Sequence, residues 1–434
     1  MTEVKVGIIG LGNVGGGTAR ILVENWGQIA QKLGFPLVLS TVCDRSARCL
    51  ELPGLSAGAR KTTDWREVVS DPAIDIVAEL IGGTTTASEI IEAAIQAGKS
   101  VVTANKELMA QQGADIWDRA IKARINLAME ASVAGGIPIH AVLREGISGD
   151  RVSALFGILN GTSNYILSEI EAHGSAFDAV LAEAQRLGYA EADPSADVDG
   201  FDARSKLALL AALAFGERIT PSDIYTEGIR RITPIDFQYA GQMGYTIRLI
   251  CSARQTPEGL LLAVRPALVP KSTVLAGVKG AYNAVWVFGK YGQDTFYYGR
   301  GAGPLPTGVA VVSDLMRVAR EIRCGSPERV SPFAHERLGE YQPIPVTLNR
   351  SAYYLRFRVE DKPGIIAGLA TALAKQQVSI DSVMQLPIQN WRDVPFVITV
   401  EPAPESSIRA AIREMQDLKF LLEPPLVMPM EKGA

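Results

Sequence analysis

Cysteine and histidine are both scarce in this chain of 434 residues. The four cysteines, Cys43, Cys49, Cys251 and Cys324, show no CxxC spacing, so we predict reduced thiols rather than disulfides or zinc ligands. The three histidines form no HExxH motif, which leaves few parts for zinc or serine-hydrolase chemistry. Any acid–base chemistry is therefore expected to use Lys, Asp or Glu side chains.

Long apolar runs and blocks of one charge are also lacking. No apolar stretch reaches the ~18 residues of a membrane helix, and the N-terminal VKVGIIG segment has no signal-peptide organisation. Lys and Arg number 43 against 47 Asp and Glu, a net charge of −4, which excludes the basic field that nucleic acid or an acidic membrane requires. We expect a cytoplasmic protein whose partners are small molecules, with no nucleic acid and no membrane.

The first 130 residues alternate strand-like and helical segments. Strands are expected at 4–9, 37–43, 74–81 and 100–103, with a helix at 13–24 after the first of them. This order predicts an α/β domain at 1–130 with a Rossmann-type, doubly wound parallel sheet.

The middle of the chain is less regular. Residues 131–304 combine a helix at 201–215 with strands such as 284–289, so we predict an α+β domain for substrate binding and oligomerisation. A helix within 305–323 is expected to pack back on the first domain.

The C-terminal part begins with a candidate linker at 324–350, which contains four prolines and little hydrophobic periodicity. Beyond it, residues 351–434 show the order strand, helix, strand, strand, helix, strand, which is typical of a ferredoxin-like domain. The six elements expected there are 353–359, 364–375, 378–385, 394–401, 405–417 and 421–427.

A glycine-rich turn follows the first predicted strand and opens the first predicted helix. Gly10 permits the tight turn, Gly12 lets the backbone approach a pyrophosphate, and Gly15 allows close helix packing. Because a helix N-terminus attracts anions, we predict a dinucleotide site rather than only a tight turn. After the second strand, Asp44 suits the ribose hydroxyls of NAD and Arg45 suits the 2′-phosphate of NADP, so the sequence leaves the preference open.

Lys106 follows the strand expected at 100–103. Ligands on open α/β sheets bind at the carboxyl ends of the strands, so Lys106 is expected to face the ligand crevice. Spacing by itself equally allows a solvated loop lysine.

An acid-rich segment leads into the helix expected at 201–215. It contains Glu191, Asp197 and Asp202 and ends at Lys206. One interpretation is a polar loop whose last carboxylate and lysine form an exposed i,i+4 pair. The other interpretation is functional: Lys206 begins an apolar run, so it can be partly desolvated and donate a proton, while Glu191 offers a carboxylate to a substrate ammonium.

Several segments together resemble the homoserine dehydrogenase family over nearly the whole chain. They are GLGNVGGG at 10–17, TANK at 103–106, EASVAGGIP at 130–138, LNGTSNYIL at 159–167, GYAEADPSADVDGFDARSKLALL at 188–210 and GRGAGPLPTG at 299–308. The resemblance is to monofunctional members with a C-terminal ACT domain, since no kinase-like segment precedes Met1. It implies reversible, NAD(P)H-dependent reduction of L-aspartate 4-semialdehyde to L-homoserine, on the route to threonine and methionine.

The resemblance also implies roles for individual residues. Lys206 would donate the proton, with Asp202 orienting it and Lys106 beside the substrate and the cofactor. The implied substrate-binding residues are Glu191, Asp197 and Thr162. The residues implied to bind NADP, or NAD as the alternative, are Gly10, Gly12, Asn13, Val14, Gly15, Arg45, Lys106 and Gly303. The chain departs from some members at Ala196, where those members carry an Asp.

A sodium ion is implied as well. The backbone oxygens that would hold it belong to Glu130, Val133, Gly135 and Ile137. Carbonyl ligation needs no acidic side chains, so the residue types themselves do not reveal such a site.

The ACT-like domain carries a DxPG-type loop from Asp361 to Gly364 that leads into a helix. A helix N-terminus suits the carboxylate of an amino acid, so we expect threonine to bind there as an effector. Such domains pair readily, and we expect a homo-oligomer, either a dimer or a tetramer. The alternative is a dimerisation module without a ligand.

Two other functions are compatible with these residues. One is a dehydrogenase of another small amino acid, which would need substrate-binding carboxylates other than Glu191 and Asp197. The other is a nucleotide and amino-acid sensor without turnover. Rapid oxidation of the reduced cofactor by L-aspartate 4-semialdehyde distinguishes homoserine dehydrogenase from both.

Overall fold

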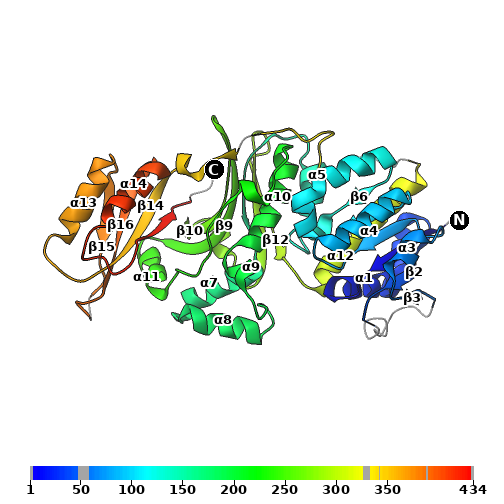
Figure 1. Cartoon of the computed structure of the whole chain (residues 1–434), viewed down its shortest axis with the longest axis horizontal. Coiled ribbons are helices and arrows are strands. Elements are labelled where there is room, and N and C mark those ends of the chain that lie inside the picture. The colour runs from blue at the N-terminus through cyan, green and yellow to red at the C-terminus, as the bar shows by residue number, and fades with distance from the viewer. Residues whose placement is uncertain (1–2, 47–57, 326–332, 342, 388–389, 432–434) are drawn as a thin grey trace.

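The computed structural model describes residues 3–46, 58–325, 333–341, 343–387 and 390–431. Within these residues the strands form three sheets, which follow one another along the long axis of the molecule in chain order (Figure 1). The first sheet lies at the right of the view, the second in the centre and the third at the left.

The first sheet is the expected parallel, doubly wound sheet. In the described chain its strands follow the order β3-β2-β1-β4-β5-β6, and every neighbouring pair is parallel, which is the Rossmann strand order. Its strands are β1 (Val4–Ile9), β2 (Leu37–Cys43), β3 (Arg60–Thr62), β4 (Ile76–Glu79), β5 (Ser100–Thr103) and β6 (Leu127–Ala128). The predicted fold class of this region is confirmed.

Both faces of this sheet are covered by helices, because its strands are apolar on both sides. Ile8 and Ala78 face one helical layer, and Ile9 and Val77 face the other. The helices of this region are α1 (Asn13–Glu24), α2 (Trp26–Leu33), α3 (Trp65–Ser70), α4 (Thr85–Gln96), α5 (Lys106–Ala123) and the returning α12 (Pro304–Arg323).

The returning helix α12 packs tightly against α1 through glycine. A Cβ at Gly17 would lie 2.1 Å from the carbonyl oxygen of Pro304, and one at Gly308 would lie 3.0 Å from the backbone of Gly17. A chain segment about 300 residues from the N-terminus therefore completes one face of the first domain.

The second sheet is mostly antiparallel and lies in the middle of the molecule (Figure 1). Its strands are β7 (Val152–Ile158), β8 (Tyr225–Thr226), β9 (Tyr245–Thr256), β10 (Gly259–Pro270), β11 (Tyr282–Gly289), β12 (Asp294–Arg300) and β13 (Pro343–Ile344). The helices of this region are α6 (Ile139–Ala141), α7 (Gly161–His173), α8 (Phe177–Arg186), α9 (Ser195–Val198), α10 (Phe201–Phe215) and α11 (Pro234–Gln242).

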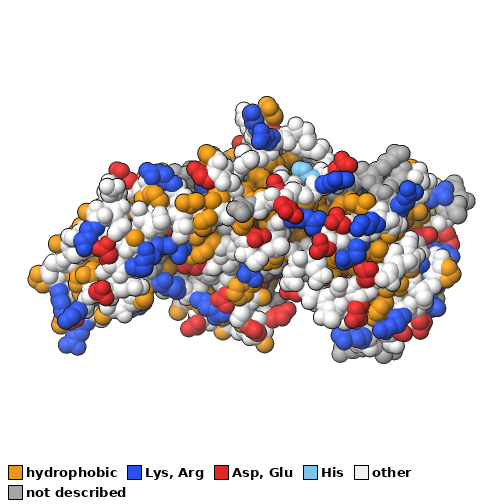
Figure 2. Space-filling view, turned by 45° about the horizontal axis from the view of Figure 1, so that its top comes forward, with side chains coloured by type: hydrophobic (Ala, Val, Ile, Leu, Met, Phe, Trp, Pro, Cys, Tyr) orange, Lys and Arg blue, Asp and Glu red, His pale blue; other side chains and the backbone are white. Residues whose placement is uncertain are grey.

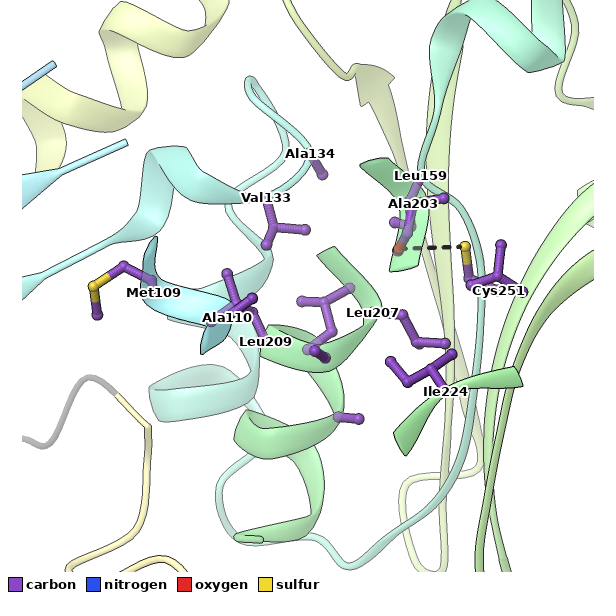
Figure 3. Packing of buried hydrophobic residues seen from close by; sticks show 14 of the residues in the cluster. Met109, Ala110, Val133, Ala134, Leu159, Ala203, Leu207, Leu209, Ile224 and Cys251 are labelled. Atoms are coloured by element: carbon purple, nitrogen blue, oxygen red, sulfur yellow. Dashed lines mark hydrogen bonds between the residues drawn. The ribbon is translucent and has the colours of Figure 1, made fainter. Parts of the chain in front are cut away.

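Helix α10 joins the first two regions. Every residue from Leu207 to Leu213 is buried, as expected for a helix that is apolar all round. Figure 3 shows α10 between α5, which carries Ala110, and the strand that carries Cys251, whose thiol lies 4.0 Å from the carbonyl oxygen of Ala203. The hydrophobic core is therefore continuous from the first sheet to the second.

The third sheet has the strand order β15-β16-β14-β17, and the chain order of its elements is ferredoxin-like. The elements are β14 (Arg350–Val359), α13 (Ile365–Lys375), β15 (Ile380–Met384), β16 (Val394–Pro404), α14 (Glu405–Met415) and β17 (Leu426–Pro429). The last strand begins five residues later than predicted: Leu421 forms only an isolated bridge with Val359, and two prolines directly precede β17.

The two faces of this third sheet have different partners. Tyr353 and Leu355 of β14 lie beneath α13 and α14, whereas the intervening Tyr354 packs with Phe237 and Tyr239 of α11. The C-terminal domain is therefore docked on the second sheet region rather than suspended from it.

Part of the predicted linker, residues 326–332 and 342, lies outside the described residues, as does Cys49. The described part packs on the second region: Phe333 is buried, and β13 pairs in parallel with β10. On the face shown in Figure 2, Lys and Arg side chains are interspersed with Asp and Glu. No helix among the described residues combines the length and the apolar character needed to cross a bilayer.

Candidate active site

The first turns of α10 carry an aspartate and a lysine on the same side of the helix. Gly200, with φ +85°, starts the helix, and Asp202 and Lys206 follow one turn apart. The Lys206 ammonium donates to Asp202 Oδ2 at 2.7 Å and to the carbonyl oxygen of Leu159 at 2.9 Å. Both side chains are largely buried, so this is not the exposed helix pair of the first interpretation.

A second lysine reaches the same carboxylate from another domain. Lys106 is the first residue of α5, which Asn105 caps through its side-chain oxygen, and its Nζ lies 2.6 Å from Asp202 Oδ1. The packing of α5 on α10 brings these residues together, although they are far apart in the sequence (Figure 3). Lys106 therefore starts a helix and pairs with a buried carboxylate, and is not a solvated loop residue.

The electrostatics of this cluster keep Asp202 charged. Burial would raise the pKa of Asp202, but the Lys206 and Lys106 ammonium groups outweigh it and hold the pKa below its ordinary value. Burial lowers the pKa of Lys106, but Asp202 more than offsets this, so the pKa is raised. Both ammonium groups therefore face the same ionised carboxylate.

A polar side chain at the N-terminus of α7 joins the cluster to a second aspartate. Asn160 caps α7 and donates through Nδ2 to both Asp197 Oδ1 at 2.6 Å and Asp202 Oδ2 at 2.8 Å. Burial, followed by the Asp202 charge, raises the pKa of Asp197. The sequence analysis did not single out Asn160, although Asn is one of the residues that N-caps favour.

Two predicted substrate residues lie at the edge of the cluster. The Thr162 hydroxyl donates to the carbonyl oxygen of Tyr189 at 2.6 Å and so anchors the loop at 188–194. Glu191 lies exposed in this loop, and its carboxylate makes no ion pair with any described residue. The structure thus brings together Lys106, Asp197, Asp202 and Lys206, but not Glu191.

A cleft of about 410 Å³ opens at the carboxyl ends of β1, β2 and β4. Gly10, Gly12, Asp44 and Arg45 line it on one side, and Ile81 to Thr86 line it on the other. A Cβ at Gly12 would meet no described atom within 4 Å, whereas one at Gly15 would lie 1.8 Å from the Gly10 carbonyl oxygen. Gly12 therefore leaves room for a ligand, whereas Gly15 is required by the packing of α1 against the turn.

Of the predicted cofactor residues, Gly10, Gly12 and Arg45 line this cleft, and the others lie outside its lining. Asn13 and Val14 open α1, and Gly303, with φ +126°, starts α12. Asp44 accepts the Leu11 N–H through Oδ2 at 2.7 Å and the Ser46 N–H through Oδ1 at 2.8 Å.

Arg45 lies beside Asp44 at the mouth of the cleft. Its side chain is exposed and makes no ion pair with the described residues.

The predicted sodium segment is a buried turn next to α12. Glu130, Val133, Gly135 and Ile137 are all buried or nearly so, and both Ala134 and Gly135 have positive φ. The Glu130 carboxylate accepts the N–H groups of His140 and Ala141, and burial, helped by Asp314, raises its pKa to about 7. Among the described residues, no group of three or more His, Cys, Asp or Glu could hold a metal, so any ion here depends on carbonyl oxygens.

Comparison with known proteins accounts for all three regions. Family profiles match at residues 10–130 (homoserine dehydrogenase, NAD binding domain), 138–316 (homoserine dehydrogenase) and 353–416 (ACT domain). A homoserine dehydrogenase of Pseudomonas aeruginosa is 42% identical, with 100% of each chain covered. The chain belongs to the homoserine dehydrogenase family.

Solved structures agree with this assignment. A homoserine dehydrogenase from Thiobacillus denitrificans matches with a TM-score of 0.92 and 41% identity, covering 100% of this chain and 99% of that one. A hyperthermophilic archaeal homoserine dehydrogenase in complex with NADPH matches with a TM-score of 0.62 and 25% identity, covering 73% of this chain and 98% of that one.

Family membership confirms the predicted function. The protein is an NAD(P)-binding oxidoreductase that interconverts L-aspartate 4-semialdehyde and L-homoserine, and its C-terminal domain is an ACT domain. Another small amino-acid dehydrogenase and a sensor without turnover are not favoured.

Proposed function

We propose that Lys206 is the proton donor in the reduction of L-aspartate 4-semialdehyde, with Asp202 orienting it and Lys106 beside it. The observation that carries this proposal is the single buried carboxylate shared by two lysines from different domains. An ammonium has three N–H groups, and Lys206 uses two of them on Asp202 and Leu159 among the described residues. The third is left for the substrate oxygen.

The cleft at the end of the first sheet suits a dinucleotide, and the bound reduced nicotinamide supplies the hydride. Lys206 gives its proton to the carbonyl oxygen as the aldehyde carbon accepts that hydride, so the product is a neutral alcohol. In the oxidation of homoserine, neutral Lys206 takes the hydroxyl proton back. Asp202 keeps Lys206 in place through both directions, and the nearby Lys106 ammonium stabilises the developing oxyanion.

The substrate's amino-acid end is assigned to Asp197, Thr162 and Glu191. Asp197 lies within the polar cluster, hydrogen-bonded to Asn160, and offers a carboxylate to the substrate ammonium. Thr162 anchors the loop that carries Glu191. Because Glu191 is exposed, its carboxylate reaches the ammonium only when this loop closes over the cleft.

Replacement of Lys206 by Ala tests the proposal. We expect kcat for the aldehyde to fall by about 10²-fold or more, the range for loss of a general acid, while the dissociation constant of the reduced dinucleotide changes little. Lys122→Ala is the matched control, because Lys122 is an exposed lysine on α5 away from the cluster. A Lys206→Ala enzyme with the kcat of the control would overturn the assignment.

We further propose that the cofactor is NADP, with NAD as the alternative. Gly10, Gly12, Gly15, Asn13, Val14, Lys106 and Gly303 would surround it. Two observations favour NADP: Asp44 already accepts two backbone N–H groups, and Arg45 has no carboxylate partner among the described residues. The NADPH complex of the archaeal relative is consistent with this choice.

For the sodium ion we propose the backbone oxygens of Glu130, Val133, Gly135 and Ile137. The left-handed conformations of Ala134 and Gly135 turn the chain sharply within this segment, and a Cβ at Gly135 would lie 2.6 Å from the Gly301 carbonyl oxygen. The ion would brace the junction between the first two regions. Activity that is identical in sodium-free and sodium-containing buffers of equal ionic strength would contradict this role.

For the ACT domain we propose that threonine binds beside the loop Asp361–Gly364 and lowers activity. A cleft of about 310 Å³ lies there, lined among others by Asp361, Gly364, Ile366 and Gln385. We also propose a homo-oligomer, a dimer or a tetramer, and a cytoplasmic location, which the free thiols of the buried Cys43 and Cys251 support. Asp361→Ala should retain catalysis but lose inhibition by millimolar threonine.

A chain of contacts between the ACT domain and the proposed substrate residues supports this regulatory role. Arg356 of β14 contacts Thr233 and Asp236 at the start of α11. Just before them, Ile229 donates its N–H to the Val198 carbonyl oxygen at 2.8 Å, and Arg230 pairs with Asp199 at 2.6 Å. These contacts reach the segment that carries Asp197, so a shift of the ACT domain would alter the substrate site.

A further inference from the structure

A second buried carboxylate lies at the carboxyl end of β4, outside the lysine cluster. Glu79 is the last residue of this strand and is 0% exposed. Its neighbours across the sheet are Ile9, directly before the glycine-rich turn, and Thr103, at the end of β5. The position is the point where the order of the parallel strands reverses, which is where ligands bind in such sheets.

The Glu79 carboxylate accepts hydrogen bonds from two loops. Its Oε1 accepts the Ile81 N–H at 2.9 Å, and the Gly82 N–H also favours its charged form. Its Oε2 accepts the Thr103 hydroxyl at 2.6 Å. Burial raises the pKa of Glu79, but these donors oppose the shift and match an ionised carboxylate.

The second of these contacts continues to Lys106. Thr103 Oγ1 accepts the Asn105 N–H at 3.0 Å, and Asn105 in turn donates through Nδ2 to the Gly83 carbonyl oxygen at 2.6 Å. The Asn105 side-chain oxygen caps α5, whose first residue is Lys106. One carboxylate therefore holds both the loop that lines the dinucleotide cleft and the helix start that carries a cluster lysine.

We propose that Glu79 is a positioning residue of the reaction: it fixes the loop Ile81–Gly83 and the N-terminus of α5 relative to each other, and so places Lys106 against Asp202. This inference rests on the proposed role of Lys106. Gly82 and Gly83 have φ values of +73° and +71°, so the loop needs such external anchors to keep one conformation. The carboxylate supplies the anchor without touching the substrate.

Glu79→Gln tests the inference with little change in shape. The new amide group would face Thr103 Oγ1, which already accepts a hydrogen bond, so the Thr103 proton loses its acceptor. We expect kcat to fall by about 10-fold to 100-fold, since a catalytic group displaced by about 1 Å can cost that much. We also expect a several-fold weaker affinity for NADPH, measured by fluorescence titration without substrate. Thr103→Val, which removes only the hydroxyl link, should lower kcat in the same direction and provides the test if Glu79→Gln does not fold.

The discriminating measurement repeats Glu79→Gln in a Lys106→Ala background. If Glu79 acts through Lys106, its substitution should then change kcat by no more than about 2-fold, because coupled residues are not additive. The same fold-loss in both backgrounds would show a merely structural role and overturn the inference. Glu405→Gln is the matched control, because Glu405 is a buried carboxylate on α14 that pairs with Arg265, and it should leave kcat and NADPH affinity unchanged.

The two proposals fail in different ways. An unchanged kcat in Lys106→Ala would remove the proposed role of Lys106 and, with it, the action of Glu79 through that residue. An inactive Lys106→Ala enzyme together with a fully active Glu79→Gln enzyme would overturn only the inference about Glu79.

Discussion

Two clusters in this molecule use similar charged groups for different purposes. In the active-site cluster, Asp202 faces Lys106 and Lys206, and the Lys106 side chain is 37% exposed. In the docking cluster, Asp236 of α11 faces Arg356 of the ACT domain, and their side chains are 0% and 3% exposed. In the first cluster one carboxylate faces two cations and one side is open to solvent, whereas in the second Asp236 and Arg356 are both closed off from solvent.

The hydrogen bonds of the two aspartates explain the difference. Asp236 accepts from Arg356, from the N–H and hydroxyl of Thr233, and from the Tyr354 hydroxyl, so its oxygens have little capacity left for a ligand. Burial raises the pKa of Asp236, whereas two ammonium groups hold the pKa of Asp202 below its ordinary value despite burial. A catalytic site needs hydrogen-bond donors that are free to bind a substrate, such as the third N–H group of Lys206, whereas a docking contact needs no free donor.

The largest effect is expected from breaking the docking pair. Arg356→Met should lower the free energy of unfolding by about 3–5 kcal/mol, because it leaves Asp236 buried without its cation. Urea unfolding measures this loss. Arg358→Met is the control: that arginine is 40% exposed and pairs with Asp393, so its loss should cost at most about 1 kcal/mol. Equal losses for the two variants would contradict the comparison.

Removing the carboxylate of the active-site cluster should instead affect catalysis. Asp202→Asn is expected to lower kcat by about 10²-fold, since Lys106 and Lys206 lose the group that places them. Because the pKa of Asp202 is lowered in the folded state, its ionised form stabilises the fold above the ordinary pKa of Asp, and this stabilisation is lost as pH falls through the folded pKa. The free energy of unfolding of Asp202→Asn should therefore fall less with decreasing pH than that of the unsubstituted protein. A variant that loses stability but keeps kcat would make the two clusters equivalent.

A third prediction concerns His140, a histidine that is buried in its neutral form. His140 is fully buried, and burial, followed by the Arg144 charge, lowers its pKa from 6.5 to about 3. Because the unfolded chain binds this proton first, stability is lost as pH falls from about 6.5 toward 3. His140→Leu should therefore gain about 2 kcal/mol relative to the unsubstituted protein between pH 7 and pH 5, measured by urea unfolding at both values. An identical stability difference at both pH values would exclude this linkage.

The smallest expected effect concerns Arg45, which makes no ion pair with the described residues. Arg45→Ala should raise KM for NADPH by about 10-fold and KM for NADH by less than about 2-fold, as expected for loss of one charge-assisted contact. Rising salt should reduce the difference, because Arg45 is exposed. Arg20→Ala, an exposed arginine on α1 that pairs with Glu24, serves as control. Equal effects on both cofactors would mean that Arg45 does not select between them.

The sequence by itself predicted the family, the parallel first sheet and the ferredoxin-like last domain. These follow from local features: a strand–glycine turn–helix pattern, alternating apolar segments and long, specific motifs. Boundaries were less accurate where turns are irregular, as at β4, which ends at Glu79 rather than at residue 81 because the two following glycines reverse the chain. The docking of the ACT domain was not predicted, since Tyr354 and Tyr239 carry no sign of their partners in the local pattern.

The site shows the same division. Lys106 and Lys206 could each be singled out from the sequence, since one follows a strand and the other begins an apolar helix. That they share Asp202, that Asn160 joins Asp202 to Asp197, and that Glu79 reaches Lys106 through Thr103 were decided only by the tertiary structure. The physical reason is that each of these contacts joins different strands or helices, and the packing of α5 on α10 and the pairing of β4 with β5, not local propensity, bring them within hydrogen-bonding distance.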